Sequence, residues 1–159
     1  MDQELKKKVL RKIVHGVYVA GVKDKNKLNA FTATWISQIS FKPPLIVFGV
    51  NRESVSFQMI AESRVFVINI LERGQKQLAQ HFLKPAHLGA DKLKGIRYRL
   101  GERTGAPVLE EAAAYIECEV RGIHPGGDHG IVVGEVVNVG LHRDADPLTL
   151  QETGWHYGG

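Results

Sequence analysis

Short runs of apolar and β-branched residues, separated by polar turns, make up most of this chain. Such runs are typical of β-strands. The runs that predict strands are 16–24, 29–40, 45–50, 65–71, 95–100, 114–120 and 131–142. Strands and long helices do not alternate steadily, as they do in a parallel sheet. The pattern therefore predicts a mainly β fold with short helices, an antiparallel barrel rather than a doubly wound sheet.

Helical periodicity is confined to three short segments: 2–13, 56–63 and 74–83. In the first, Asp2 can cap a helix in which Leu5, Val9 and Ile13 recur at fourfold spacing. Residues 84–95 read as a polar link that contains glycine. The helices are thus expected to decorate the barrel rather than to form its core.

The most regular strand is predicted over 114–120. Two sets of side chains alternate there: Ile116, Cys118 and Val120 on one face, and Tyr115, Glu117 and Glu119 on the other. We expect the first set to face the core. Cys118 is then a small core residue rather than a nucleophile.

Composition narrows the class of protein. The chain has 159 residues, 43% of them hydrophobic, which suits one domain over 1–159 with a real core. A single cysteine excludes a disulfide framework and a cysteine-rich zinc module, and fits a reducing cytosol. No apolar run approaches the length of a membrane span, and the start lacks the features of a signal peptide. We expect a cytoplasmic protein without a membrane partner.

Charge is distributed unevenly along the chain. Residues 1–99 carry 18 basic and 7 acidic side chains, whereas residues 100–159 carry 3 and 10. This asymmetry suits a basic site for an anionic ligand or an electrostatic dimer, unless the fold mixes both halves over one surface. The densest basic cluster, 6–12, lies on the terminal helix without interleaved aromatic residues, so we do not expect nucleic acid as a partner.

Several familiar motifs are missing from the sequence. It contains no G-x-G-x-x-G after a strand, no Walker lysine loop and no G-x-S-x-G elbow. The closest histidines, His124 and His129, flank a glycine-rich turn without cysteine or a third nearby ligand. Rossmann, P-loop and triad-hydrolase chemistry are therefore disfavoured, and no metal site is expected.

The segment 29–37 alternates small hydroxyl residues with bulky ones. Small side chains leave backbone amides and carbonyls open to a flat ligand, and such amides can bind the polar edge of a heteroaromatic ring. The alternative is a half-buried strand in which the threonines reflect only β propensity. The pattern by itself favours the second interpretation.

The turn 51–56 opens a helix. Its hydroxyl groups, the free amides of a helix N-terminus and Arg52 would make a phosphate-binding site without a glycine-rich loop. The alternative is a plain N-cap formed by Ser54 or Ser56. The sequence leaves the two interpretations equally open.

These two segments, separated by Pro43-Pro44 and a buried strand, resemble the flavin reductase-like family of FMN-binding split barrels. The runs TWISQISFKPPLIVFGV, SRVFVINIL, LAQHFLKP, GAPVLEEAAAYIECEV and GDHGIVVGEVV follow the order of that family. Within it, the chain is most similar to the C-terminal flavin reductase modules of cyanobacterial diflavin flavoproteins. The joint order and spacing of these sequence runs make the resemblance specific.

The resemblance implies a homodimer of Greek-key-like split barrels with FMN, or FAD, bound near the dimer interface. The residues that it assigns to the isoalloxazine ring and ribityl chain are Asn29, Ala30, Thr32, Ala33, Thr34 and Ser37. Those that it assigns to the phosphate are Asn51, Ser54 and Ser56. By the same resemblance, His81 and Phe82 border the flavin and Tyr157 closes the pocket.

The implied activity is transfer of a hydride from NADH or NADPH to the flavin, which supplies reduced flavin to a partner monooxygenase. His129, in the Gly-Asp-His turn, is the expected catalytic residue, and it would orient the nicotinamide or balance charge. One alternative is a flavoredoxin-like electron carrier that retains FMN. Another is a barrel similar to pyridoxine phosphate oxidase, of which the sequence carries little.

Overall fold

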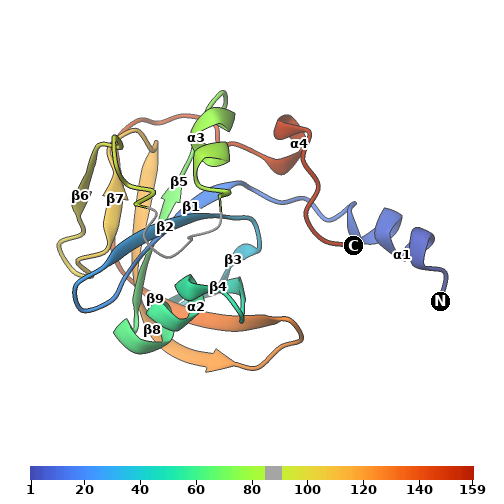
Figure 1. The fold of residues 1–159 in the computed structure, drawn as a ribbon, viewed down its shortest axis with the longest axis horizontal. Helices are drawn as coiled ribbons and strands as arrows, with labels where there is room; N and C mark the ends of the chain where they lie inside the picture. Colours follow the sequence, from blue (N-terminus) through green and yellow to red (C-terminus); the bar gives the residue numbers. More distant parts are fainter. Residues whose placement is uncertain (85–90) are drawn as a thin grey trace.

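A computed structural model describes residues 1–84 and 91–159 of the chain. Its strands in these ranges are β1 (Tyr18–Lys23), β2 (Leu28–Ala33), β3 (Ile36–Phe41), β4 (Pro44–Asn51), β5 (Val65–Ile70), β6 (Tyr98–Leu100), β7 (Pro107–Leu109), β8 (Ala114–His124) and β9 (His129–Leu141). Its helices are α1 (Gln3–Leu10), α2 (Val55–Ser63), α3 (Lys76–His81) and α4 (Leu150–Thr153). The fold is mainly β with short helices, as the sequence pattern predicts (Figure 1).

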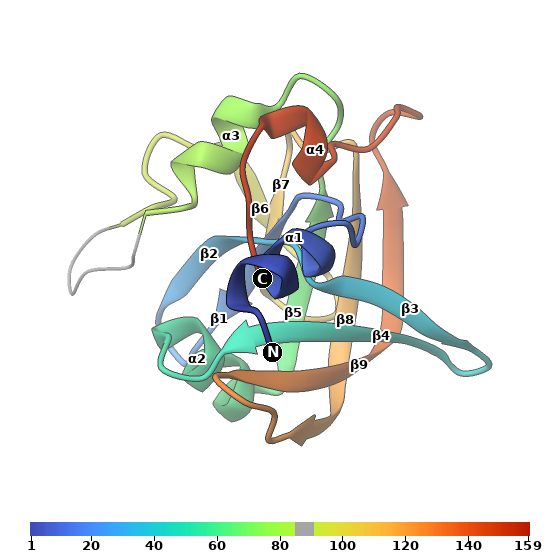
Figure 2. The same cartoon turned by 90° about the vertical axis from the view of Figure 1, so that its right-hand side faces the viewer.

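Seven strands form one antiparallel sheet in the order β2-β1-β5-β8-β9-β4-β3. Its two edge strands, β2 and β3, follow each other in the chain, and only Thr34 and Trp35 separate them. The sheet therefore curls until its edges meet at this break (Figure 2). The single strand expected over 29–40 is wrong, because the chain passes here from one edge of the sheet to the other.

The core confirms this curling. Ala20 of β1 and Phe48 of β4 lie four positions apart in the sheet order, yet they belong to one buried cluster. Alternate residues of β4 point inward because successive side chains of a strand face opposite sides. The Phe48 ring lies 5.8 Å from Phe31 and 5.5 Å from Phe66. Cys118 is fully buried in the same cluster, as expected.

A small two-stranded sheet, β6 with β7, covers the outside of the barrel. Val108 of this sheet and Ala106, just before it, pack against Val67 and Tyr115. The face of 114–120 opposite the core-facing set is therefore partly buried as well, and Glu117 is fully buried. The alternation within one strand carries no information about such a second layer.

The buried Glu117 carboxylate joins the two layers. Its Oε1 accepts hydrogen bonds from the Thr104 hydroxyl at 2.7 Å and from the backbone amides of Thr104 and Arg103 at 2.9 and 3.1 Å. Its Oε2 accepts one from Asn138 at 2.6 Å. Burial raises the pKa of Glu117, but these donors outweigh burial and hold the pKa below its usual value.

Most predicted helices and strands occur with shifted ends. Asp2 caps α1, and its carboxylate accepts from two backbone amides of the first turn. Strand β7 and helix α4 have no counterpart in the sequence expectation. The link expected over 84–95 includes the buried residues Lys92 and Leu93, and its central part, 85–90, lies outside the described residues. In the described ranges, no helix has both the length and the apolar character that a membrane crossing requires.

Candidate active site

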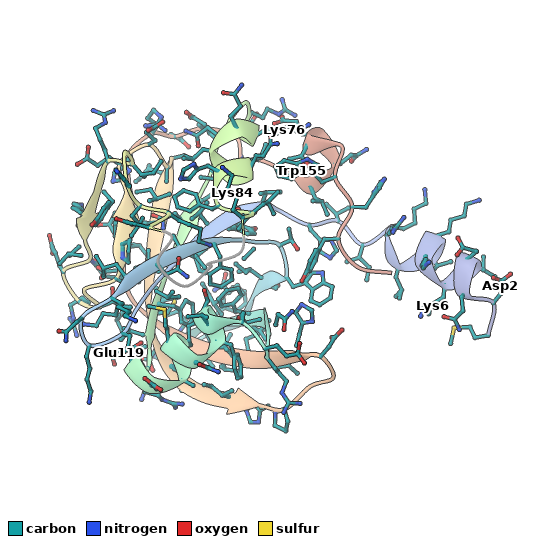
Figure 3. All side chains as sticks on the ribbon, in the orientation of Figure 1. Asp2, Lys6, Lys76, Lys84, Glu119 and Trp155 are labelled. Atoms are coloured by element: carbon teal, nitrogen blue, oxygen red, sulfur yellow. The ribbon has the colours of Figure 1, made fainter. Side chains whose placement is uncertain are left out.

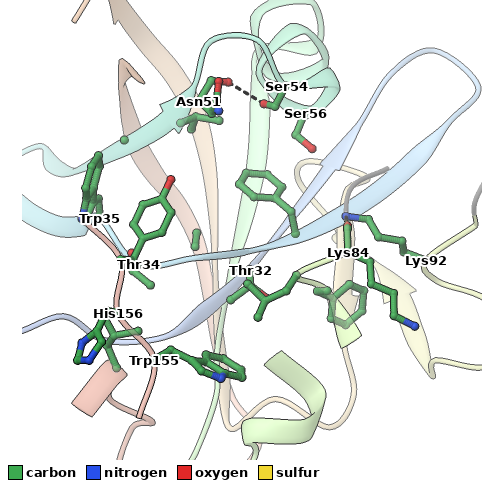
Figure 4. A pocket seen from close by; sticks show the side chains of 18 residues that line it. Thr32, Thr34, Trp35, Asn51, Ser54, Ser56, Lys84, Lys92, Trp155 and His156 are labelled. Carbon is green, nitrogen blue, oxygen red and sulfur yellow. Dashed lines mark hydrogen bonds between the residues drawn. The ribbon is translucent and has the colours of Figure 1, made fainter. Parts of the chain in front are cut away.

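A cavity of about 490 Å³ opens where the barrel is split (Figure 4). Its walls come from the end of β2 and the break after it, from β4 and the start of α2, from residues 82–84 with Lys92, and from the tail after α4. The sheet edges supply a fixed floor, and the tail closes the opposite side with Trp155, His156 and Tyr157. The cavity volume lies within the range of small-molecule sites.

Hydroxyl groups gather at one end of the cavity, where α2 begins. Ser54 is the N-cap: its hydroxyl accepts from the Phe57 amide at 3.1 Å and donates to the Asn51 carbonyl at 2.7 Å. The buried Ser56 hydroxyl accepts a hydrogen bond from Asn29 at 3.1 Å. The predicted N-cap at Ser54 is thus confirmed. It also places both serines at a helix N-terminus, which favours bound anions.

Two lysines add positive charge to this cavity. The Lys92 residue is 8% exposed, and its ammonium donates to the Lys84 carbonyl at 3.1 Å. Burial lowers the pKa of Lys92 to about 8, since the charged form loses solvation. The described residues of the wall include Lys84 but neither Asp nor Glu. An anionic ligand would therefore meet donors and cations without an opposing carboxylate.

Thr34 carries a polar atom without a partner. Its hydroxyl is buried and forms no hydrogen bond within the described residues, although Thr34 lines the cavity. Its neighbour Thr32 differs, because that hydroxyl donates to the Ala79 carbonyl at 2.5 Å. A buried hydroxyl without a partner costs about 1–3 kcal/mol. The position of Thr34 therefore points to a ligand that supplies the missing hydrogen bond.

Aromatic rings line the cavity beside Asn51, whose partner in the neighbouring strand β9 is His129. The Trp35 ring lies 5.0 Å from Tyr157 and 4.6 Å from His129. Gly49 approaches Trp35 so closely that a Cβ there would lie 3.2 Å from the indole, and its amide donates to the Trp35 carbonyl at 2.9 Å. The backbone of β4 thereby holds Trp35 at the break between β2 and β3.

His129 is held between two partners. Its Nδ1 lies 2.8 Å from the Asp128 carboxylate, and its Nε2 lies 2.6 Å from the Tyr157 hydroxyl. The hydrogen bond with His129, and then the charge interaction with the same imidazole, lower the pKa of Asp128. Burial, and then the charge of Asp128, raise the pKa of Tyr157. His129 contacts the Trp35–Tyr157 pair from the side that faces away from the cavity.

The structure brings most of the predicted site residues together. Those in the cavity wall are Thr32, Ala33, Thr34, Asn51, Ser54, Ser56, Phe82 and Tyr157. The others lie behind or beside the wall: Asn29 and Ala30 are buried, Ser37 is exposed on β3, and His81 contacts the Lys92 carbonyl through Nε2 at 2.7 Å. His129 is one residue removed from the cavity. The ligand contacts of all these residues stay predictions.

Sequence reasoning missed several residues of the wall. Lys92 lies in a segment interpreted as a polar link, and Trp155 and His156 lie in the C-terminal tail, of which only Tyr157 was assigned to the site. The apolar residues Leu148 and Leu150, just before the tail, were the available signal, since they belong with Trp155 to a second apolar cluster, which includes Val19 of β1 and Ala79 of α3. Nothing local marks Lys92 as buried.

Other chemistry finds little support in the described residues. No group of three or more His, Cys, Asp or Glu side chains gathers there in a way that could hold a metal ion. Burial raises the pKa of the Cys118 thiol to about 12, so this buried cysteine is a poor nucleophile.

Together, the split barrel and its cavity define a class of protein: an antiparallel β-barrel with a site for a flat, phosphorylated ligand. The chain belongs to the flavin reductase like domain family, whose model matches residues 10–159. The resemblance inferred from the motifs is thereby confirmed.

Curated relatives support the same family assignment. Diflavin flavoprotein A 1 of Synechocystis sp. (strain ATCC 27184 / PCC 6803 / Kazusa) is 36% identical over 150 residues, which cover 94% of this chain and 26% of the relative. The NADH-dependent FAD reductase of Streptomyces globisporus is 35% identical over 107 residues, 67% of this chain and 59% of that relative. The chain thus spans only part of the length of these curated relatives.

A solved structure matches the fold over almost its whole length. The NADH:FAD oxidoreductase SgcE6 of Streptomyces globisporus C-1027, in complex with NAD and FAD fragments, superposes with a TM-score of 0.85 at 28% identity. The match covers 98% of this chain and 92% of that one. The fold expected from the sequence is therefore confirmed.

Proposed function

We propose that this protein is a flavin reductase, which oxidises NADH or NADPH and reduces FMN or FAD. The observation that carries the proposal is the Thr34 hydroxyl, which has no partner within the described residues and lies in a cavity lined by aromatic rings, hydroxyl groups and two lysines. This donor set fits a flavin, since the ring system is flat and polar at one edge and the phosphate is anionic. The relatives named as flavin reductases support the same activity.

Different residues would contact different parts of the flavin. Ser54, Ser56 and Lys92 would hold the phosphate, because hydroxyl and ammonium donors form strong hydrogen bonds to phosphate oxygens. The Ser54 hydroxyl, which donates to the Asn51 carbonyl in the flavin-free protein, would turn toward the phosphate. Thr34 would donate to the polar edge of the ring. Phe82 would pack along the ring or ribityl chain, where its buried side chain supplies apolar contact.

A bound flavin would supply the redox chemistry as the acceptor of a hydride from NADH or NADPH, with one further proton taken from solvent. The chain contributes position and charge. Trp35 and Tyr157 exclude water from one side of the ring. His129, fixed by Asp128 and Tyr157, would orient the nicotinamide or balance charge. No protein nucleophile takes part, and the buried Cys118 stays outside the reaction.

The decisive experiment uses the purified protein and FMN. We expect FMN to bind, with a shifted visible spectrum, and NADH or NADPH added without oxygen to bleach the flavin. Failure of FMN and FAD to bind would contradict the proposal. Tight FMN that neither dinucleotide bleaches would instead favour the flavoredoxin-like electron carrier.

We further propose that residues 1–159 form one flavin reductase-like domain, which acts in the cytoplasm as a homodimer and passes reduced flavin to a monooxygenase or another redox protein. The dimer is supported by large exposed apolar side chains, among them Phe41 (91% exposed) and Leu141 (68% exposed). Light scattering tests the dimer. A Phe41→Glu variant that keeps the wild-type mass would argue against this part of the interface.

A further inference from the structure

Arg52 belongs to the turn 51–56 that was expected to bind phosphate, but it does not line the cavity. The described wall includes Asn51, Ser54 and Ser56 of this turn and omits Arg52. The guanidinium instead donates from Nη1 to the Gly127 carbonyl at 3.3 Å. Among residues 1–84 and 91–159, its side chain makes no other hydrogen bond and no ion pair. A bond to phosphate therefore does not explain the position of this side chain.

Arg52 joins the end of β4 to the turn before β9. Strand β4 pairs with β9 as far as Asn51, whose partner is His129. The next amide along the chain, that of Arg52, donates to the Asp128 carbonyl at 3.0 Å and so extends the ladder beyond the strand. The side chain of Arg52 reaches one residue further, to Gly127. Backbone and side chain together thus hold the two residues that precede His129.

The turn held by Arg52 has little packing of its own. It is tight, because a Cβ at Gly126 would collide with the His129 carbonyl. Gly127 has no side chain to pack, and a Cβ there would meet no atom within 4 Å. The Asp128 side chain is 91% exposed. The two hydrogen bonds of Arg52 therefore supply much of the restraint on this turn.

The turn acts on the cavity through His129 and Tyr157. His129 Nδ1 lies 2.8 Å from the Asp128 carboxylate, and its Nε2 lies 2.6 Å from the Tyr157 hydroxyl. The Tyr157 ring lies 5.0 Å from Trp35, and both rings line the flavin cavity, whereas His129 does not. A shift of the turn would therefore reach the cavity as a shift of Tyr157.

The wall formed by Trp35 and Tyr157 has a second hollow behind it, of about 660 Å³. His129 lines this hollow beside the two rings, and the segment from Lys6 to His15 lines its other side. Helix α1, in that segment, stands apart from the barrel (Figure 3). Because open space rather than packed core lies behind the wall, the hydrogen bond to His129 helps to fix the position of Tyr157.

We propose that Arg52 is a positioning residue of the flavin site: it fixes the turn that carries His129, and His129 then holds Tyr157 at the cavity wall. This inference rests on the proposed binding of flavin. Arg52 would act on the part of the cavity that covers the flavin ring, which FMN and riboflavin share. An arginine that bound the phosphate would instead act on FMN and leave riboflavin unaffected.

The test compares Arg52→Met with Arg97→Met. Both arginines are exposed, so both variants should fold, and each loses one positive charge. Fluorescence titration is carried out in about 0.5 M NaCl, which screens the long-range effect of that charge. We expect Arg52→Met to lower the affinity for FMN and for riboflavin equally, by about threefold, and Arg97→Met to change neither. Arg52→Lys, which can still donate to Gly127, should recover most of the loss. A loss confined to FMN would overturn the proposal.

A double-mutant cycle tests the path from Arg52 to Tyr157. Tyr157→Phe keeps the ring and removes the hydroxyl that His129 holds, so it should also weaken both flavins. In that background, adding Arg52→Met should lower either affinity by less than about 1.5-fold, because the two changes break the same path. Independent, additive losses would contradict the path.

A measurement without flavin separates this inference from the proposed function. The only tryptophans, Trp35 and Trp155, both line the cavity beside Tyr157. Acrylamide should quench their fluorescence more strongly in Arg52→Met than in the wild type or in Arg97→Met, because the wall is looser. A wild type that binds neither FMN nor riboflavin overturns the proposed function. Quenching that is the same in all three proteins overturns the positioning role of Arg52, whether or not flavin binds.

Discussion

The two hollows on either side of Trp35 are built from different kinds of structure. The flavin cavity rests on β2, β4 and the N-terminus of α2, and three of its polar residues, Thr34, Ser56 and Lys92, are buried. The second hollow shares Trp35 and Tyr157 with it, but its other wall is the segment from Lys6 to His15, which includes part of a helix without a single buried residue. The comparison indicates that the packing of the barrel fixes the polar groups of the first hollow, whereas the helix beside the second contributes exposed side chains.

Removal of the carboxylate that joins the two layers of the barrel should have the largest effect. We expect Glu117→Ala to lower the free energy of unfolding by about 3 kcal/mol, because it leaves buried donors from Thr104 and Asn138 without an acceptor. Chemical denaturation measures the loss. The conservative Glu117→Gln, which keeps one acceptor oxygen, should lose less.

The same carboxylate predicts a pH dependence. Because the pKa of Glu117 is lowered in the folded state, its stabilising effect is complete above the pKa that it has in the unfolded chain. The effect is lost as the pH falls through the folded-state pKa. The stability difference between wild type and Glu117→Gln should therefore shrink in acid, and a difference that grows in acid would contradict this assignment.

The hydroxyl end of the cavity predicts selectivity for phosphorylated flavin. A Ser54→Ala, Ser56→Ala double variant should lower the affinity for FMN about 100-fold, because it removes donors to the phosphate. The affinity for riboflavin, which lacks phosphate, should fall less than about threefold. Fluorescence titration with both flavins measures the difference. Equal losses would mean that the phosphate binds elsewhere.

Two threonines offer a matched pair of smaller changes. Thr34→Val should weaken flavin about tenfold and stabilise the flavin-free protein by about 1 kcal/mol, because it removes a buried hydroxyl without a partner. Thr32→Val removes a hydroxyl that already donates to Ala79, so it should destabilise the flavin-free protein instead. Thermal unfolding with and without FMN separates the two. A destabilised Thr34→Val would contradict this explanation.

Lys92 predicts the smallest effect, and a dependence on pH. Because the pKa of Lys92 is about 8, its side chain is positively charged below this pH and loses the charge as the pH rises through it. FMN should therefore bind about threefold to tenfold more weakly near pH 9 than near pH 7, whereas riboflavin should not. In Lys92→Met the FMN affinity should be lower at pH 7 and nearly independent of pH. A wild-type affinity that rises with pH would refute this role.

Local sequence patterns were sufficient for much of the fold. The continuous apolar run of 45–50 and the alternation in 114–120 predicted strands, because both patterns are typical of strands. The Asp2 and Ser54 caps followed from the chemistry of helix N-termini. Part of the candidate site was also predicted, since each of the segments 32–34 and 51–56 places its hydroxyl residues within a few positions of one another.

Other features arise only when distant segments meet. Glu117 is buried because β6 and β7 cover the barrel, which the alternation in 114–120 could not indicate. The basic first part of the chain, 1–99, and the acidic second part, 100–159, mix in one sheet, since β8 and β9 pair with β5 and β4. The +4 net charge of the chain therefore gave no indication of where the cations would gather.

The sequence by itself determined a mainly β fold and the caps of its helices, and its resemblance to a family led to the prediction of a phosphate-binding turn and a ligand-lining strand. Tertiary structure alone decided that Lys92 and the tail residues Trp155 to Tyr157 complete the cavity, and that His129 lies behind Tyr157. The physical reason is that periodicity and capping are properties of neighbouring residues. Burial, in contrast, is a property of every segment that folds over a position.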